Sequence, residues 1–148
     1  MRGAMAIDIK DHPLTLSQMR YRLPYLTDYG RLFRQTKKNA RSRGIEWRLS
    51  DQEITEIIVN SHHRCEITGI EFRIRIINNS IERISKDPYF RNPWAPSVDR
   101  IHASGDYTAE NVRLVAAIVN QAMGTWGDED FWTMVRAAAP LAPPSEAE

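Results

Sequence analysis

Three polar residues in the C-terminal half of the chain have the types and spacing of a metal site. Asp99 follows an apolar residue, Asn111 opens a second apolar run, and Asn120 lies about one turn into the segment after that run. Carboxylate and amide side chains offer hard oxygen ligands, which suit Mg²⁺ or Mn²⁺ ions that retain several waters. Because Asp and Asn are also common in turns and helix caps, the prediction rests on the spacing of the set.

The elements that must position these residues are a strand, a turn, a second strand and a helix within residues 96–124. Alternation and turn residues predict them in that order, which would make the three side chains converge. The expected bounds are a strand at Val98–His102, a turn at Gly105–Asp106, a returning strand at Val112–Val115 and a helix at Ala116–Met123.

A basic helix is predicted upstream. Thr27 or Asp28 can cap it, it runs to about Arg43, and Gly44 is placed to end it. The formal net charge of the chain is only +1, but the residues from 31 to 48 hold seven basic side chains and one acidic one, Glu46. The basic residues are Arg31, Arg34, Lys37, Lys38, Arg41, Arg43 and Arg48. By charge alone this is a polyanion-binding surface or a solvated helix face.

Three further elements are expected around the site. Ser50 and Glu53 have capping-box spacing and predict a second helix. The residues from Cys65 to Arg75 alternate as a β-hairpin would, and Asp128 can cap a last helix. Four aromatic residues are expected in the core, since they flank the helix that should pack on the site: Trp94, Trp126, Phe131 and Trp132.

Length and composition indicate one α+β domain. The 148 residues are 42% apolar and 26% charged, as in an ordinary globular protein. We divide them into an irregular arm (1–25), a basic helical region (26–62), a core (63–138) and a disordered tail (139–148). No apolar run is long enough to cross a bilayer and no secretory signal is visible, so we expect a cytoplasmic protein without a membrane partner. The single cysteine, Cys65, excludes an internal disulfide and is expected to be buried.

Several short motifs in this order resemble the HNH nuclease family. They are Pro96–Ile101, Gly105–Thr108, Glu110–Val115 and Val119–Asn120, with Arg43–Ile45 and Cys65–Phe72 similar to the lead-in of phage and bacterial members. The resemblance covers roughly residues 36–134. It implies a ββα-metal core with a hairpin and N-terminal helices, and hydrolysis of phosphodiester bonds in DNA with a divalent metal, Mg²⁺ first and Mn²⁺ second. The partner cysteines of zinc-bearing relatives are absent, so no structural zinc is expected.

The resemblance assigns roles to the three polar residues. Asp99 matches the carboxylate that ends the first strand and binds the metal, and Asn120 matches the second protein ligand. The alternative for Asn120 is a helix-cap or core asparagine. Asn111 matches the middle asparagine of the catalytic motif, which mainly ties the loop together by hydrogen bonds.

The chain departs from the usual motif at Arg100, where the family has the histidine that activates the attacking water. Arginine stays protonated and cannot be an ordinary general base. It can bind a phosphate with two hydrogen bonds, so we expect Arg100 to hold the scissile phosphate. The Asp-Arg-Ile sequence resembles a recurring subgroup of the family.

The identity of the base is therefore left open among histidines and water. His63 or His62 could reach the site from the hairpin. We place His102 behind them, because alternation would turn it to the opposite strand face from Asp99. Alternatively, the metal lowers the pKa of its own water.

The resemblance also favours the first interpretation of the basic helix, with DNA as the partner. We expect four of its residues to contact phosphates: Lys37, Lys38, Arg41 and Arg43. Two alternatives remain. One is a catalytically weak or inactive DNA-binding module that kept the HNH fold, and the other is an effector that acts through protein contacts with its N-terminal arm.

Overall fold

The computed structural model describes residues 26–73 and 93–146. The described elements, in chain order, are α2 (Leu26–Ser42), α3 (Asp51–Asn60), β1 (Pro96–Arg100), β2 (Val112–Ala116), α4 (Ala117–Met123), α5 (Asp128–Ala138) and the 3₁₀ helix η2 (Ala139–Leu141). The expected N-terminal arm, residues 1–25, lies outside these ranges. Helices and an antiparallel sheet together confirm the α+β class.

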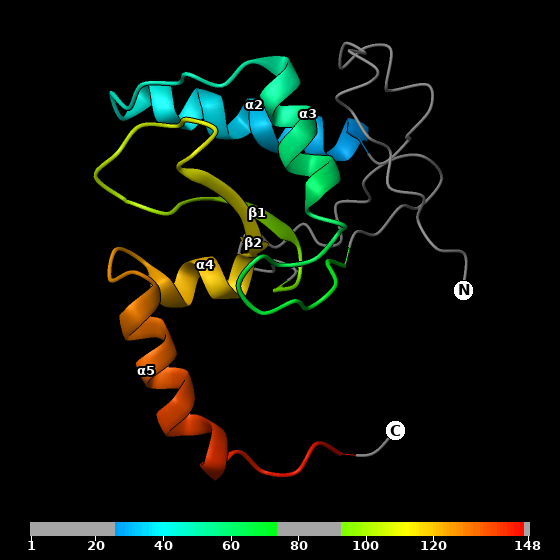
Figure 1. Cartoon of the computed structure of the whole chain (residues 1–148), viewed down its shortest axis with the longest axis vertical. Helices are drawn as coiled ribbons and strands as arrows, with labels where there is room; N and C mark the ends of the chain where they lie inside the picture. The colour runs from blue at the N-terminus through cyan, green and yellow to red at the C-terminus, as the bar shows by residue number, and fades with distance from the viewer. Residues whose placement is uncertain (1–25, 74–92, 147–148) are drawn as a thin grey trace, which may run out of the picture.

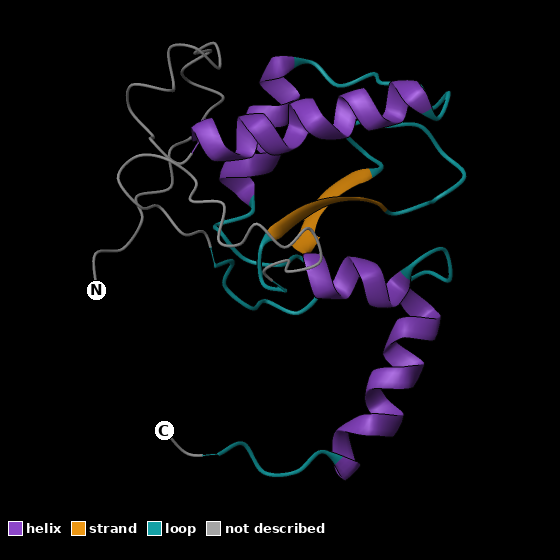
Figure 2. Cartoon of the chain, turned by 180° about the vertical axis from the view of Figure 1, so that it is seen from behind, coloured by secondary structure: helices purple, strands orange, loops and turns teal. Residues whose placement is uncertain are grey.

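The two strands form the middle layer of the fold. Figures 1 and 2 show α2 and α3 on one side of β1 and β2, and α4 on the other. The strands pair antiparallel, with Pro96 opposite Ala116 and Arg100 opposite Val112, so that Asp99 lies opposite Arg113. The order strand, strand, helix that the sequence predicts is therefore present.

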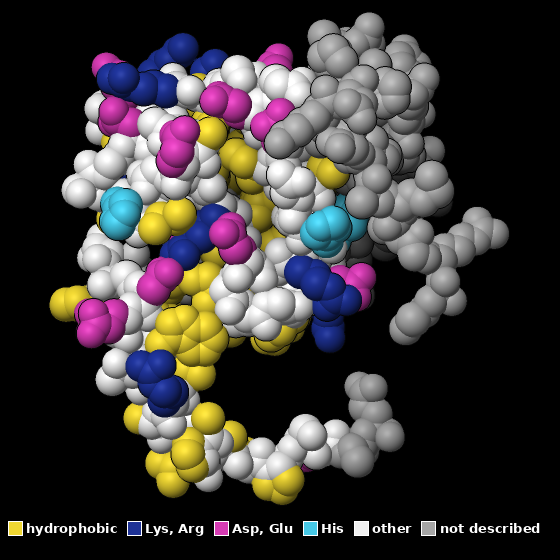
Figure 3. Space-filling model, viewed as in Figure 1, with side chains coloured by type: hydrophobic (Ala, Val, Ile, Leu, Met, Phe, Trp, Pro, Cys, Tyr) yellow, Lys and Arg dark blue, Asp and Glu magenta, His cyan; other side chains and the backbone are white. Residues whose placement is uncertain are grey.

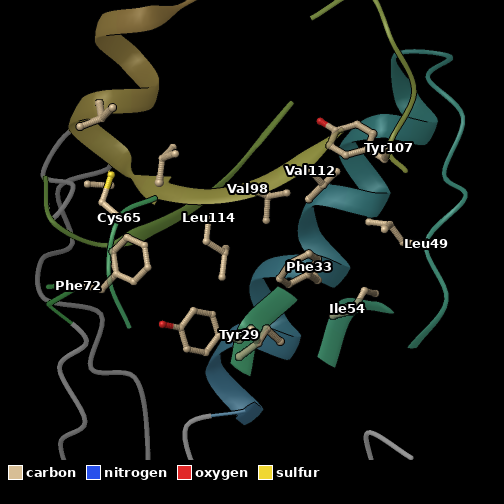
Figure 4. Close-up of a cluster of buried hydrophobic side chains, with 14 of the residues drawn as sticks. Tyr29, Phe33, Leu49, Ile54, Cys65, Phe72, Val98, Tyr107, Val112 and Leu114 are labelled. Atoms are coloured by element: carbon tan, nitrogen blue, oxygen red, sulfur yellow. The ribbon is translucent and has the colours of Figure 1, made fainter. Parts of the chain in front are cut away.

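The main core fills the space between α2, α3 and one face of the sheet. In Figure 4, Val98 and Leu114 point from the strands toward Phe33 and Tyr29 of α2. All five residues of β2 are buried, which makes this strand the centre of the fold. Cys65 is also buried, as expected.

The helix boundaries follow local signals in the sequence. After Ser42 the backbone passes through Gly44, whose φ of 69° ends α2 in the left-handed region that glycine tolerates. At the start of α3, the Ser50 hydroxyl accepts a hydrogen bond from the Glu53 amide. The Glu53 carboxylate accepts one in return from the Ser50 amide. The predicted capping box is thus confirmed.

Several expected elements differ in detail. The first strand begins at Pro96 and ends at Arg100, so it does not reach His102. The described part of the expected hairpin is a turn closed by a single bridge between Arg64 and Glu71, without regular strands. Its last residues, 74 and 75, lie outside the described ranges. The turn is tight because Cys65 exchanges backbone hydrogen bonds with residues 69 and 70.

The C-terminal part shows three differences. Gly127, not Asp128, precedes α5 as its cap, and Asp128 makes no side-chain capping hydrogen bond. The tail expected from residue 139 begins with the single turn of η2. Trp126 is 77% exposed rather than in the core, because it sits in the turn between α4 and α5, where no element covers it. Phe131 is buried, and Trp94 and Trp132 are partly buried against the core. Within the described residues, no helix is long and apolar enough to span a membrane.

Candidate functional site

The site is built on the face of β1 that is turned toward α4. Side chains alternate along a strand, so Ser97 and Asp99 share this face, and Val98 points into the core on the other. The register places Arg113 of β2 directly opposite Asp99. Its Nε donates a hydrogen bond of 2.8 Å to Oδ2 of Asp99, and both side chains are buried.

Arg113 is shared between two carboxylates. Its Nη1 and Nη2 donate to the two oxygens of Asp128 at 2.8 and 2.5 Å, so the first turn of α5 is tied to the sheet. The hydrogen bond from Arg113 lowers the pKa of Asp128. Burial raises the pKa of Asp99, and the hydrogen bond from Arg113 offsets this only in part. The three side chains together carry one net negative charge when both acids are ionised.

Asn120 of α4 lies over the same strand face. Its Nδ2 donates to the Ser97 hydroxyl at 2.7 Å and, at 3.5 Å, to the Val98 carbonyl. The structure therefore brings Asn120 against the residue two positions before Asp99, on the face that the two share. One carboxylate and one amide are a donor set that fits Mg²⁺ or Mn²⁺ with water completing the shell. In the described ranges, no cluster of three or more His, Cys, Asp or Glu side chains is placed to hold a metal.

Asn111 ties the loop between the strands together. Its Oδ1 accepts a 2.8 Å hydrogen bond from the His102 amide, and its Nδ2 donates to the carbonyls of His102 and Asp106. Gly105 is required beside it, because a β-carbon at that position would lie 2.8 Å from the Asn111 amide nitrogen. The loop-tying hydrogen bonds expected of Asn111 are therefore present.

Arg100 lies on the opposite face of β1 from Asp99. Its Nη1 donates to the Gly105 carbonyl at 2.6 Å, and its guanidinium carbon is 5.2 Å from the centre of the Tyr107 ring. Arg100, which we expect to hold the scissile phosphate, therefore points away from Asp99, since adjacent residues of a strand face opposite ways. The arginine that meets Asp99 is Arg113.

His102 lies in the loop after β1, and its backbone amide donates a hydrogen bond to Oδ1 of Asn111. His63 instead lies with Nδ1 3.1 Å from the Tyr29 hydroxyl of α2. The strand ends at Arg100, so His102 lies beyond it, and Asn111 fixes the backbone of His102; which histidine serves as the base stays a prediction.

The basic cluster lies on the exposed side of α2 and in the turn that follows it. Figure 3 shows Lys and Arg side chains gathered over one end of this helix. Of the seven, only Arg48 has an acidic partner within the described residues, pairing with Glu46 at 2.7 Å and Asp106 at 3.6 Å. The four expected phosphate contacts are all exposed: Lys37, Lys38, Arg41 and Arg43.

Sequence reasoning named neither Arg113 nor Asp128 as part of the site. The available signal was an arginine inside an otherwise apolar strand, Val112–Val115, since a charge on a buried strand requires a partner. Comparison of the chain with models of protein families, with curated proteins and with solved structures found no match.

Proposed function

We propose that the chain is an HNH-type, metal-dependent endonuclease that hydrolyses phosphodiester bonds in DNA. The observation that carries this proposal is the placement of Asp99 and Asn120 over one face of a strand–strand–helix unit. The loop within that unit is fixed by Asn111. These are the positions at which the resemblance in sequence requires a carboxylate, an amide and a loop-tying asparagine.

The charge of the cluster supports a cation at Asp99. Arg113 is held by two hydrogen bonds to Asp128 and by one to Asp99. Arg113 would stay anchored to Asp128 if Asp99 turned part of its carboxylate to a metal. The net negative charge of the three residues then favours a bound cation. When bound, a divalent ion would neutralise charge on the phosphate and lower the pKa of a water.

The chain's own residues would supply the remaining steps. Arg113 would hold Asp99 on the face turned toward α4, and Asn120 would supply its amide oxygen as the second ligand from that helix. One of three histidines, His63, His62 or His102, would take a proton from the attacking water. Lys37, Lys38, Arg41 and Arg43 would bind the DNA backbone without sequence choice.

Supercoiled plasmid tests this proposal. We expect the protein to relax or linearise it with Mg²⁺ or Mn²⁺ and not with EDTA. Asp99→Asn should abolish cleavage, and Glu110→Gln, which neutralises an exposed acid in the loop between β1 and β2, should retain it. Cleavage by Asp99→Asn at the rate of the unmodified protein would contradict the assigned site.

A second candidate is a DNA-binding module that keeps the fold without cleaving. Two observations favour it: Arg113 already neutralises Asp99, and position 100 carries an arginine where the family has its base. This candidate predicts retarded duplex DNA in a gel at low salt, with intact plasmid under every metal tested.

A further inference from the structure

Part of the basic cluster borders a hollow on the α2 side of the sheet, on the face opposite to that of Asp99. An open hollow of about 450 Å³ lies between the end of α2 and the turn after it, and it is lined by Lys37, Arg41, Gly44, Ile45, Glu46 and Trp47. Its volume lies in the range of small-molecule sites, which extends from about 300 to 1,000 Å³. It combines two cationic side chains with an aromatic ring.

The hollow carries a positive charge because its one acidic residue, Glu46, is paired with Arg48. Glu46 accepts hydrogen bonds from Arg48, which leaves Lys37 and Arg41 without an acidic partner within the described residues. Both are exposed. Two unpaired cations at one opening favour a phosphate group, which carries the charge and the acceptor oxygens that they lack.

The aromatic wall of the hollow is held rigidly. Trp47 packs on Tyr107 with ring centres 5.1 Å apart, and Tyr107 exchanges backbone hydrogen bonds with residues 46 and 48. The guanidinium of Arg100 lies over the same tyrosine ring. An indole that is fixed beside unpaired cations is the arrangement on which nucleic-acid bases stack in single-strand sites.

We propose that this hollow binds one unpaired nucleotide of a DNA substrate, with its phosphate at Lys37 and Arg41 and its base against Trp47. This rests on the proposed function in one respect, since it takes DNA as the partner. It adds a substrate class: DNA that carries a single-stranded end or gap is bound in preference to fully paired duplex.

Binding in EDTA tests the proposal independently of cleavage. We compare a blunt duplex with the same duplex bearing a 5′-phosphorylated thymidine overhang, by fluorescence anisotropy of labelled DNA. The unmodified protein should bind the overhang duplex at least about fivefold more tightly, as expected for one stacked base. The overhang should also quench tryptophan fluorescence through Trp47, above the background of the chain's other tryptophans.

Variants separate stacking from charge. Trp47→Leu, which keeps apolar contact with Tyr107, should abolish both the preference and the quenching, and Trp47→Phe should retain part of the preference. Lys37→Ala with Arg41→Ala, both exposed, should reduce the preference in a protein that melts as the unmodified one does. Arg34→Ala removes an exposed charge elsewhere on α2 and should leave the ratio of affinities unchanged.

The outcomes also distinguish this inference from the proposed function. Equal affinity of the unmodified protein for both duplexes would overturn the inference even if plasmid is cleaved. An unchanged preference in the double variant of Lys37 and Arg41 would also overturn the inference, because both side chains are exposed and their loss should not affect folding. The unmodified protein could instead prefer the overhang duplex, lose this preference in Trp47→Leu, and cleave no DNA. That result would support the nucleotide site and contradict the proposed nuclease activity.

Discussion

Asp99 and Arg113 face each other across the two strands as a buried ion pair, with side chains only 11% and 8% exposed. Burying a charge is costly unless it is paired, so each residue requires the other. Asp128 completes the arrangement from α5. The cluster therefore joins the proposed metal ligand to the helix that follows the strand–strand–helix unit.

Removing the arginine should destabilise the fold strongly. Arg113→Met leaves Asp99 without its partner and unties Asp128, so we expect the free energy of unfolding to fall by about 3 kcal/mol or more. Adding Asp99→Asn should recover a large part of this loss, because the uncompensated charge is gone. Urea unfolding measures both variants against Arg136→Met, an exposed arginine on α5. Equal stability of Arg113→Met and the control would mean that the pair contributes little.

Metal binding should depend on the charge of Asp99. We expect Asp99→Asn to weaken Mn²⁺ binding in calorimetry by about tenfold or more, since it removes the one charged ligand of the proposed site. An asparagine is chosen over alanine because it keeps an acceptor for Arg113 at this buried position. Glu110→Gln should bind Mn²⁺ as the unmodified chain does. Unchanged Mn²⁺ affinity in Asp99→Asn would show that the metal binds at another site.

The loop of residues 102–106 should lose order without Asn111. Asn111→Ala removes three hydrogen bonds and leaves the His102 and Asp106 carbonyls without this donor, at a cost of about 2 kcal/mol. Hydrogen exchange of the His102 amide should accelerate in this variant. Asn111→Asp keeps only the acceptor oxygen, so its rate of His102 amide exchange should lie between those of the unmodified protein and of Asn111→Ala. Asn60→Ala, at the exposed end of α3, serves as the control and should leave the His102 amide protected.

Stability should fall as the solution is acidified below about pH 6.5, partly through His63. Burial lowers the pKa of His63 below the ordinary histidine value of 6.5, and the negative charge of Glu71 opposes this only in part. The unfolded chain therefore binds more protons than the folded chain between the folded pKa and 6.5. Stability is lost as pH falls through this window and levels off below the folded pKa.

His63→Asn tests this by urea unfolding at a series of pH values. Asparagine suits the left-handed backbone at this position, where φ is 59°, and it does not titrate. The variant should show a shallower loss of stability on acidification than the unmodified protein. Identical slopes would assign the acid sensitivity to other groups.

The basic helix should contribute affinity without sequence choice. Neutralising Lys37, Lys38 and Arg41 together should weaken binding to all fully paired duplexes alike, whatever their sequence. It should also flatten the logarithmic salt dependence by a slope of about 1 for each lost phosphate contact. Arg136→Ala on α5 serves as the charge control. An unchanged slope would leave these residues as a solvated helix face.

The local features of this fold could be predicted from the sequence because their causes are local. The Ser50–Glu53 capping box and the turn through Gly44 set helix ends within a few residues of chain. The order of two strands and a helix after residue 95 followed from alternation and turn residues. The family resemblance predicted the loop-tying hydrogen bonds of Asn111, and these bonds are present in the structure.

The arrangement of charges around Asp99 was decided only by the tertiary structure. Pairing with Arg113 depends on the register of two strands separated by a loop, and the tie to Asp128 depends on how α5 meets the sheet. Alternation along the strand already turned Arg100 away from Asp99, but its contact with Tyr107 depends on how the loop between the strands packs on Trp47, which is distant in sequence. The sequence by itself determined which side chains are available near the site. Their pairing was determined by strand register and helix packing, because buried charges select partners across space and not along the chain.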